Sequence, residues 1–379
     1  MPWQKRALAR VFGIAAAVLR VTRALRTSRV FHSSPRTVIL EPFGMGDVIS
    51  LQPLVDTLLG NGIHVTLCAR HLWRNLYPAR ANFEWLDCHV PWSSYDERRK
   101  YRPGVMRSQE FRHFVSHLRS MCRDAIGIDT RGDVRSILLL YLAGCRKVIS
   151  LSHYLGYDLS NTRGAAHLVP YDDGRRRWEL NLQFLRPLGL PMPARAEGPR
   201  FKHLRGSSPL LTRARIGLLP TAPWPGRLWA DSNWRELAGL LRSDGLDVVG
   251  LCGPRQSAEA ERALGKEVPI EECASIESWA KALGELRLLV TLDTGPMHLA
   301  DALEVPVVVL YGTGKLPLWA PSGSLSRIIH RQASPDFRSC HPSPNTISFG
   351  QTVMNRTTVN EVLDTVLQVD RRIRQELSA

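Results

Sequence analysis

The sequence of 379 residues lacks an apolar run long enough to cross a membrane. A membrane-spanning helix needs about 20 consecutive apolar residues, whereas the longest run near the start, residues 11–19, has nine. The seven cysteines are widely spaced, and no two of them form a C-x-x-C pair. These absences argue against a transmembrane anchor and a structural zinc site, and they favour a reducing compartment.

Acidic residues are also scarce. Asp and Glu total 35 against 50 Lys and Arg, which gives a formal net charge of +15. A charge of this size attracts an anionic partner: nucleic acid, phosphorylated lipid or a phosphorylated substrate. The sequence contains no recognised nucleic-acid-binding module, so we expect no nucleic-acid partner.

The segment before Glu41 contains no acidic residue at all. Within it, helical spacing predicts a basic amphipathic helix over residues 1–34, and two interpretations of this helix are open. It lies on an anionic membrane surface, or it packs its apolar stripe on the body of the protein. Arg20 and Arg23, close behind the short apolar run, argue against a cleaved secretory signal. The stripe consists of Val11, Ile14, Val18, Val21 and Leu25.

Short apolar runs alternate with helical periodicity after residue 35, and the alternation restarts after residue 210. Strands that alternate with helices pair in parallel, which predicts doubly wound α/β sheets. We expect an N-terminal domain over 35–190, a linker over 191–210, a C-terminal domain over 211–350 and a C-terminal helix over 351–379. Ligands of such sheets bind beyond the carboxyl ends of the strands, so candidate site residues belong to the loops that follow strands.

The first of these loops is FGMGDV, in which Gly44 and Gly46 precede Asp47. Glycines at these positions allow a sharp turn and expose the backbone amides of the following helix. The third glycine of a G-x-G-x-x-G motif is missing, because that position is Ile49. Asp47 either caps the helix or acts as a general base, since a carboxylate can accept the proton of a hydroxyl.

A second loop, within VTLDTGPMHLADAL, places Asp293, Thr294 and Gly295 between an apolar strand and a helix. The free amides and the dipole of a helix N-terminus attract an anion, and His298 on the first turn is in reach of a bound phosphate. A plain helix cap with a packed histidine is the alternative. In a third loop, PWPGRLWADSN, the guanidinium of Arg227 suits a diphosphate, with a solvated surface charge as the alternative.

Together these motifs resemble the lipopolysaccharide heptosyltransferases, a family of bacterial glycosyltransferases. In that family an early GD follows the first strand, a K-x-W element follows the first strand of the second domain, and D-T-G-x-x-H-L-A-x-A-L opens a late helix. Here they stand as residues 46–47, 227–229 and 293–303, and Arg135-Ser136 is similar to a further Arg-Ser pair of the family. The resemblance covers residues 36–369. The lysine of K-x-W is Arg227 here, and the N-terminal helix is an addition.

The resemblance implies a GT-B fold, in which two doubly wound Rossmann-like domains face a central cleft. It implies inverting transfer of a heptose from ADP-heptose to a lipid-linked surface glycan such as the lipopolysaccharide core. It implies no metal or other cofactor, and the sequence has no D-x-D metal motif. Asp47 would be the base, and Gly44 and Gly46 would contact the donor or form the turn. The implied donor-binding residues are Arg227, Asp293, Thr294, Gly295 and His298.

Basic residues concentrate in segment 96–124 of the first domain. We interpret this segment as a contact surface for the phosphates and acidic sugars of a lipid acceptor, with a solvated charged face as the alternative. The candidate acceptor contacts are Arg98, Arg102, Arg131 and Arg135.

These observations predict an enzyme in the cytoplasm, peripheral on the inner membrane of a Gram-negative bacterium. Its partners would be a nucleotide-sugar, a lipid-linked oligosaccharide and the anionic membrane surface. Two alternatives stay open. One is a non-catalytic polyanion-binding protein on the same scaffold, and the other is a GT-B enzyme with another donor or another reaction, such as epimerisation of a sugar nucleotide.

Overall fold

The computed structural model divides the chain into two compact units, Met1–Gly198 and Pro199–Ala379. The division falls inside the segment 191–210, which the sequence predicts as a linker. Each unit is described by itself. The structure describes residues 3–26, 36–90, 92, 107–154, 157–158, 166–172, 174–206, 210–312, 316–331 and 344–376.

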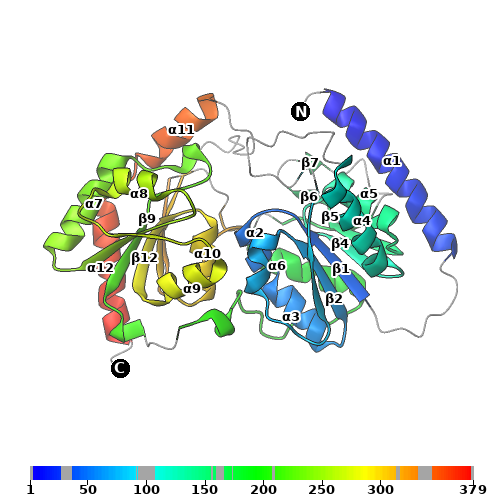
Figure 1. Ribbon diagram of the computed structural model, residues 1–379, viewed down its shortest axis with the longest axis horizontal. Coiled ribbons are helices and arrows are strands. Elements are labelled where there is room, and N and C mark those ends of the chain that lie inside the picture. Colours follow the sequence, from blue (N-terminus) through cyan, green and yellow to red (C-terminus); the bar gives the residue numbers. More distant parts are fainter. Residues whose placement is uncertain are drawn as a thin grey trace. The chain divides into compact units, whose positions relative to one another are not determined.

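The first unit is built on a six-stranded sheet in the order β3-β2-β1-β4-β5-β8, with every pair of neighbours parallel. Its helices α4 and α5 cover one face, α1 packs on α5, and α3 and α6 lie together (Figure 1). The strands are β1 (Arg36–Glu41), β2 (His64–Ala69), β3 (Phe83–Asp87), β4 (Ile126–Asp129), β5 (Lys147–Leu151) and β8 (His167–Val169), besides the two-residue pair β6 (His153–Tyr154) and β7 (Tyr157–Asp158). The helices are α1 (Trp3–Arg26), α2 (Met45–Ile49), α3 (Gln52–Gly60), α4 (Gln109–Cys122), α5 (Val134–Ala143) and α6 (Arg177–Leu182), with 3-10 turns η1 (His71–Leu76) and η4 (Gln183–Leu188).

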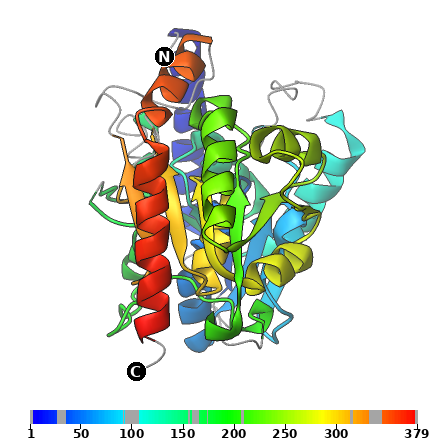
Figure 2. The same cartoon turned by 90° about the vertical axis from the view of Figure 1, so that its left-hand side faces the viewer.

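The second unit repeats this plan with the parallel order β11-β10-β9-β12-β13-β14. Helices α7 and α12 lie side by side on it (Figure 2). The strands are β9 (Arg215–Leu219), β10 (Asp247–Cys252), β11 (Ile270–Glu272), β12 (Leu286–Leu292), β13 (Val307–Tyr311) and β14 (Arg327–His330). The helices are α7 (Asp231–Ser243), α8 (Ser257–Leu264), α9 (Ile276–Gly284), α10 (Gly295–Ala302), α11 (Pro344–Met354) and α12 (Val359–Glu376), with 3-10 turns η5 (Lys202–Leu204), η6 (Leu210–Thr212) and η7 (Pro225–Arg227).

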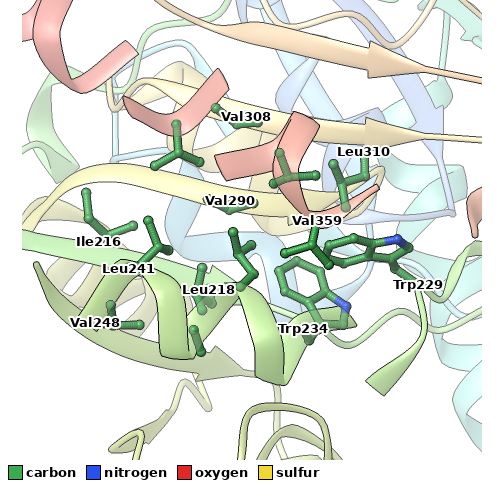
Figure 3. Close-up of a cluster of buried hydrophobic side chains, with 14 of the residues drawn as sticks. Ile216, Leu218, Trp229, Trp234, Leu241, Val248, Val290, Val308, Leu310 and Val359 are labelled. Carbon is green, nitrogen blue, oxygen red and sulfur yellow. The ribbon is translucent and has the colours of Figure 1, made fainter. Parts of the chain in front are cut away.

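The central strands are buried along their length because helices cover both faces of a parallel sheet. Every residue of β12 is buried, and the side chains of Leu288, Val290 and Leu292 meet those of α7 and α12 in one core (Figure 3). In each sheet the strand order reverses beside the first strand, between β1 and β4 and between β9 and β12. Ligands of doubly wound sheets bind at the carboxyl ends of the strands at this point. The predicted pair of doubly wound α/β sheets is confirmed.

Two predicted helices differ in detail from those observed. The N-terminal helix is described from Trp3 to Arg26, and the rest of the predicted range 1–34 lies outside the described residues. The helix turns a face other than the described part of the predicted stripe toward α5. The predicted C-terminal helix over 351–379 is broken between α11 and α12. At the break, Trp229 Nε1 donates a hydrogen bond to the backbone oxygen of Thr357, 3.0 Å away, and the Thr358 hydroxyl accepts one from the Glu361 amide at the start of α12. Among the described residues, no helix combines the length and the apolar character required to cross a bilayer.

Candidate active site

Asp47 lies in the loop that leaves the carboxyl end of β1, in the short helix α2. Its carboxylate accepts a hydrogen bond from the backbone amide of Gly44 at 3.2 Å, so Asp47 does cap the turn that carries it. Gly44 has an ordinary extended backbone with φ of −83°. Gly46 is likewise absent from the residues with positive φ, so within this turn neither glycine is required by a left-handed backbone.

Asp47 is also part of a buried network of two carboxylates and two guanidinium groups. Arg131 Nη2 lies 2.5 Å from Asp47 Oδ1, and Arg131 Nε lies 3.5 Å from Glu41 Oε1. Arg177 approaches the same two carboxylates, at 3.6 Å from Glu41 and 4.0 Å from Asp47. All four side chains are at most 6% exposed. Two positive and two negative charges balance, which is how such a cluster can be tolerated in the interior.

The network is assembled from three separate parts of the first unit. Glu41 ends β1, Arg131 follows β4, and Arg177 begins α6. Thr130 joins them, because its hydroxyl donates to Glu41 Oε2 at 2.6 Å while its backbone oxygen accepts from Arg177 Nη2 at 2.7 Å. Burial raises the pKa of Glu41, and the neighbouring arginines act in the opposite direction. Sequence reasoning missed Glu41 and Arg177.

Asp129, at the carboxyl end of β4, holds the loop that presents Arg131. Its carboxylate accepts hydrogen bonds from the Ser150 hydroxyl at 2.7 Å, from the Asp133 amide at 2.8 Å and from the Arg131 amide at 3.4 Å. Burial, aided by the negative charge of Asp133, raises the pKa of Asp129 from 3.8 to about 7. Asp129 therefore shapes the loop, and its carboxyl group keeps its proton up to near neutral pH.

This raised pKa predicts a dependence of stability on pH that Asp129→Asn removes. The folded state holds the proton of Asp129 more tightly than the unfolded state does. The stabilisation that the protonated Asp129 gives is therefore complete below pH 3.8 and is lost as the pH rises to about 7. We expect wild-type protein to lose up to several kcal/mol over this window relative to the variant. Urea unfolding at several pH values measures the difference. Asp172→Asn, at an exposed carboxylate paired with Arg175, is the matched control, and equal slopes in wild type and Asp129→Asn would contradict the assignment.

The predicted acceptor contacts are placed as follows. Arg131 faces inward to Asp47 and Glu41. Arg135 is part-exposed at 31%, is held by Asp133 through a 2.9 Å bond from Nε, and lies over the ring of Trp92 at 5.3 Å. Arg98 and Arg102 lie outside the described residues. Acceptor contact therefore stays a prediction for all four arginines.

The predicted donor residues of the second unit gather where β12 ends and α10 begins. Arg227 Nη2 lies 3.2 Å from Asp293 Oδ2, and Arg227 Nη1 donates to the backbone oxygen of Asp293 at 2.5 Å. Thr294 occupies the N-cap position of α10, and Gly295 is the first residue of that helix. One turn on, the ring of His298 contacts that of Trp319, with 5.3 Å between centroids. The structure thus brings together Arg227 and the start of the D-T-G motif, 66 residues apart in sequence.

The side chain of Thr294 leaves this helix start incompletely satisfied. Its hydroxyl makes no capping hydrogen bond to α10, and among the described residues it has no hydrogen-bond partner although Thr294 is only 6% exposed. A buried hydroxyl without a partner is uncommon and calls for an explanation. Together with the helix dipole and the guanidinium of Arg227, this hydroxyl forms a group of hydrogen-bond donors suited to an anion.

Trp229, two residues after Arg227, serves the core instead. It is 1% exposed, its ring meets that of Trp234 edge to face at 5.2 Å, and its Nε1 bonds to Thr357 (Figure 3). Helix α11 contacts the same loop, because the side-chain amide of Gln351 donates a hydrogen bond to the backbone oxygen of Pro225 at 3.3 Å. A Cβ on Gly350 would stand 2.3 Å from the Gly226 oxygen, so only glycine permits this close approach.

Sequence reasoning also missed Tyr311, which ends β13 beside the donor residues. Its hydroxyl donates to the Trp319 oxygen at 2.5 Å, and burial followed by the charge of Asp293 raises its pKa well above the usual value. The available signal was its place at the end of the buried run VPVVVLY. Arg177 gave no such signal, because it lies in a polar stretch far from Glu41 in sequence.

Known proteins are similar to this chain in sequence over part of its length. A model of the family described as glycosyltransferase family 9 (heptosyltransferase) matches residues 115–346. Lipopolysaccharide heptosyltransferase 1 of Pseudomonas aeruginosa is 29% identical over 225 residues, which cover 56% of this chain and 62% of that protein. Lipopolysaccharide heptosyltransferase 2 of Salmonella typhimurium is 31% identical over 175 residues, 42% of this chain and 48% of that protein. The matched part thus spans less than two thirds of these relatives.

Solved structures share the fold over most of this chain. The Escherichia coli heptosyltransferase WaaC with ADP matches with a TM-score of 0.68 and 19% identity, over 88% of this chain and 99% of that one. The E. coli ADP-heptose lipopolysaccharide heptosyltransferase II matches with a TM-score of 0.61 and 19% identity, over 89% and 99%. At this level of identity the likeness establishes the fold, which is that of the GT-B heptosyltransferase structures. Since the family model matches more than half of its length, the chain belongs to glycosyltransferase family 9, the heptosyltransferase family.

Proposed function

We propose that the protein transfers a heptose from ADP-heptose to a lipid-linked surface glycan such as the lipopolysaccharide core. The observation that carries this proposal is the group of hydrogen-bond donors at the start of α10. There Arg227 and the Thr294 hydroxyl, which has no partner among the described residues, flank a helix N-terminus. The family supplies the reaction class. The E. coli relative solved with ADP, and again with ADP-2-deoxy-2-fluoro heptose, supports the choice of an ADP-linked donor.

In the proposed reaction, the acceptor hydroxyl oxygen forms a bond to the anomeric carbon while the bond from that carbon to the donor phosphate breaks. Asp47 takes the hydroxyl proton, and ADP leaves with the bonding electrons. One displacement from the face opposite the leaving group inverts the anomeric centre. Arg227 and the amides that open α10 stabilise the charge that grows on the diphosphate, and they do so without a metal ion.

Arg131 has a positioning part in this scheme. It holds one oxygen of Asp47 while the Gly44 amide holds the other, so the carboxylate keeps a single orientation. Each carboxylate oxygen can accept more than one hydrogen bond, which leaves capacity for the acceptor hydroxyl. A lipid-linked acceptor lies at the membrane, so we place the enzyme in the cytoplasm, peripheral on the anionic inner-membrane surface.

Nucleotide selectivity tests the donor half of the proposal. A ligand that binds only the native state raises stability by RT ln(1 + [L]/Kd), which is about 2.7 kcal/mol at 100 times Kd. We expect ADP to raise the unfolding temperature and UDP, GDP and CMP to have little effect at equal concentration. Stabilisation by another nucleotide alone would replace the ADP-linked donor, and stabilisation by none of them would remove the support for nucleotide-sugar transfer.

A further inference from the structure

Helix α1 has two apolar faces, and the structure covers only one of them. Ala16 is fully buried, and Phe12 and Leu19 pack with it in the core that includes α5. Helix α1 runs beside α5 (Figure 1), and its other face carries large side chains that are exposed. These are Val11, Ile14, Val18 and Val21, which are 60%, 66%, 57% and 60% exposed.

The four exposed residues form one continuous stripe rather than scattered surface positions. Their spacing of three, four and three residues keeps them on one side of a helix of 3.6 residues per turn. Single exposed apolar residues are ordinary, whereas a contiguous stripe marks a surface that binds something. Since α1 is already anchored through Ala16 and its neighbours, the stripe is not needed to attach the helix to its unit.

The charge of the segment identifies the kind of partner. The sequence of α1, Trp3–Arg26, contains six basic and no acidic residues: Lys5, Arg6, Arg10, Arg20, Arg23 and Arg26. An apolar stripe on a strongly basic helix fits an anionic lipid surface, where the apolar side chains enter the boundary between headgroups and acyl chains. A second copy of the same positive segment would instead be repelled.

We infer that the outer stripe of α1 is a membrane-docking surface that binds anionic phospholipid. The helix lies in the plane of the interface, with the stripe inserted and α5 on the protein side. The inference rests on the proposed function for the purpose of docking, which is to bring the enzyme to a lipid-linked acceptor. Its test does not require transfer, so the two proposals can fail separately.

The experiment is flotation of the full chain with vesicles of phosphatidylcholine alone or mixed with phosphatidylglycerol. We expect binding to the anionic vesicles only, weakened by high salt. The double variant Ile14→Asp/Val18→Asp should lower vesicle partitioning by roughly 30-fold or more, because it removes two inserted side chains and adds two negative charges. Leu72→Asp, at an equally exposed apolar residue outside α1, is the matched control and should bind like wild type.

Two further readouts keep the result interpretable. The double variant should keep the unfolding temperature of wild type and its ADP-dependent stabilisation, which shows that both units are folded. The inference is overturned if wild type fails to float with anionic vesicles, or if the double variant floats as wild type does. It is equally overturned if light scattering shows a wild-type dimer that the double variant converts to a monomer, since the stripe would then bind a second copy.

Discussion

Asp47→Asn is expected to lower kcat for sugar transfer by about 10²-fold to 10⁴-fold, the usual contribution of a general base. The side-chain amide of the introduced asparagine cannot take the proton of the acceptor hydroxyl. The residues of the second unit that we propose to bind the nucleotide are unchanged in this variant. Affinity for ADP should therefore remain at the wild-type value. A transfer assay at saturating donor, combined with calorimetric titration of ADP, measures both quantities.

The change also disturbs the buried ion network, so it needs a control that shares this disturbance. Glu41→Gln removes the other carboxylate that faces Arg131 and Arg177 but leaves Asp47 in place. Both variants should unfold more easily, by about 3–5 kcal/mol, because each leaves buried guanidinium charge less well paired. Only Asp47→Asn should lose transfer when both are assayed below their unfolding temperatures. Equal loss in the two variants would assign Asp47 a structural part alone.

Arg227→Met is expected to weaken ADP binding by about 10-fold to 100-fold, because it removes hydrogen bonds from a charged donor to the diphosphate. A fall in kcat of about 10²-fold should accompany it, since the same guanidinium would stabilise the leaving group. Calorimetric titration and steady-state transfer assays separate the two effects.

Arg227→Lys is the matched control for this change. It keeps a positive charge opposite Asp293, so the buried carboxylate is not left alone. The family motif itself has lysine at this position, and we expect the variant to retain most of its affinity and turnover. ADP binding that is unchanged in Arg227→Met would show that the diphosphate is held elsewhere.

The parts of this molecule that sequence could predict are local in origin. The candidate donor-binding residues Asp293 and Thr294 stand between an apolar strand and a helix, and that succession can be recognised within a dozen residues. The two sheets likewise follow from alternating periodicities. The parts that escaped prediction depend on contacts between distant segments. Arg177 meets Glu41 only because α6 returns to the end of β1, and nothing near Arg177 indicates this.

Helix α1 shows a second reason for the difference. It contains two apolar faces, and periodicity identified only one of them, the stripe that includes Val11, Ile14, Val18 and Val21. The interpretation in which that stripe packs on the protein is wrong for its four described side chains, because these are exposed and the face with Phe12, Ala16 and Leu19 packs instead. Periodicity shows that a face of a helix is apolar, but it does not show which of two apolar faces meets the rest of the protein. The side chains that were left exposed are those that the docking proposal uses.

The most direct test of the account is to incubate purified wild-type protein with ADP-heptose and a heptose-free lipid-linked core acceptor, and to weigh the acceptor by mass spectrometry. The account predicts that the acceptor gains the mass of one heptose, that ADP is released in equal amount, and that both persist when divalent metal is chelated. An acceptor of unchanged mass, while the protein is folded and binds ADP, would contradict heptose transfer to this class of acceptor.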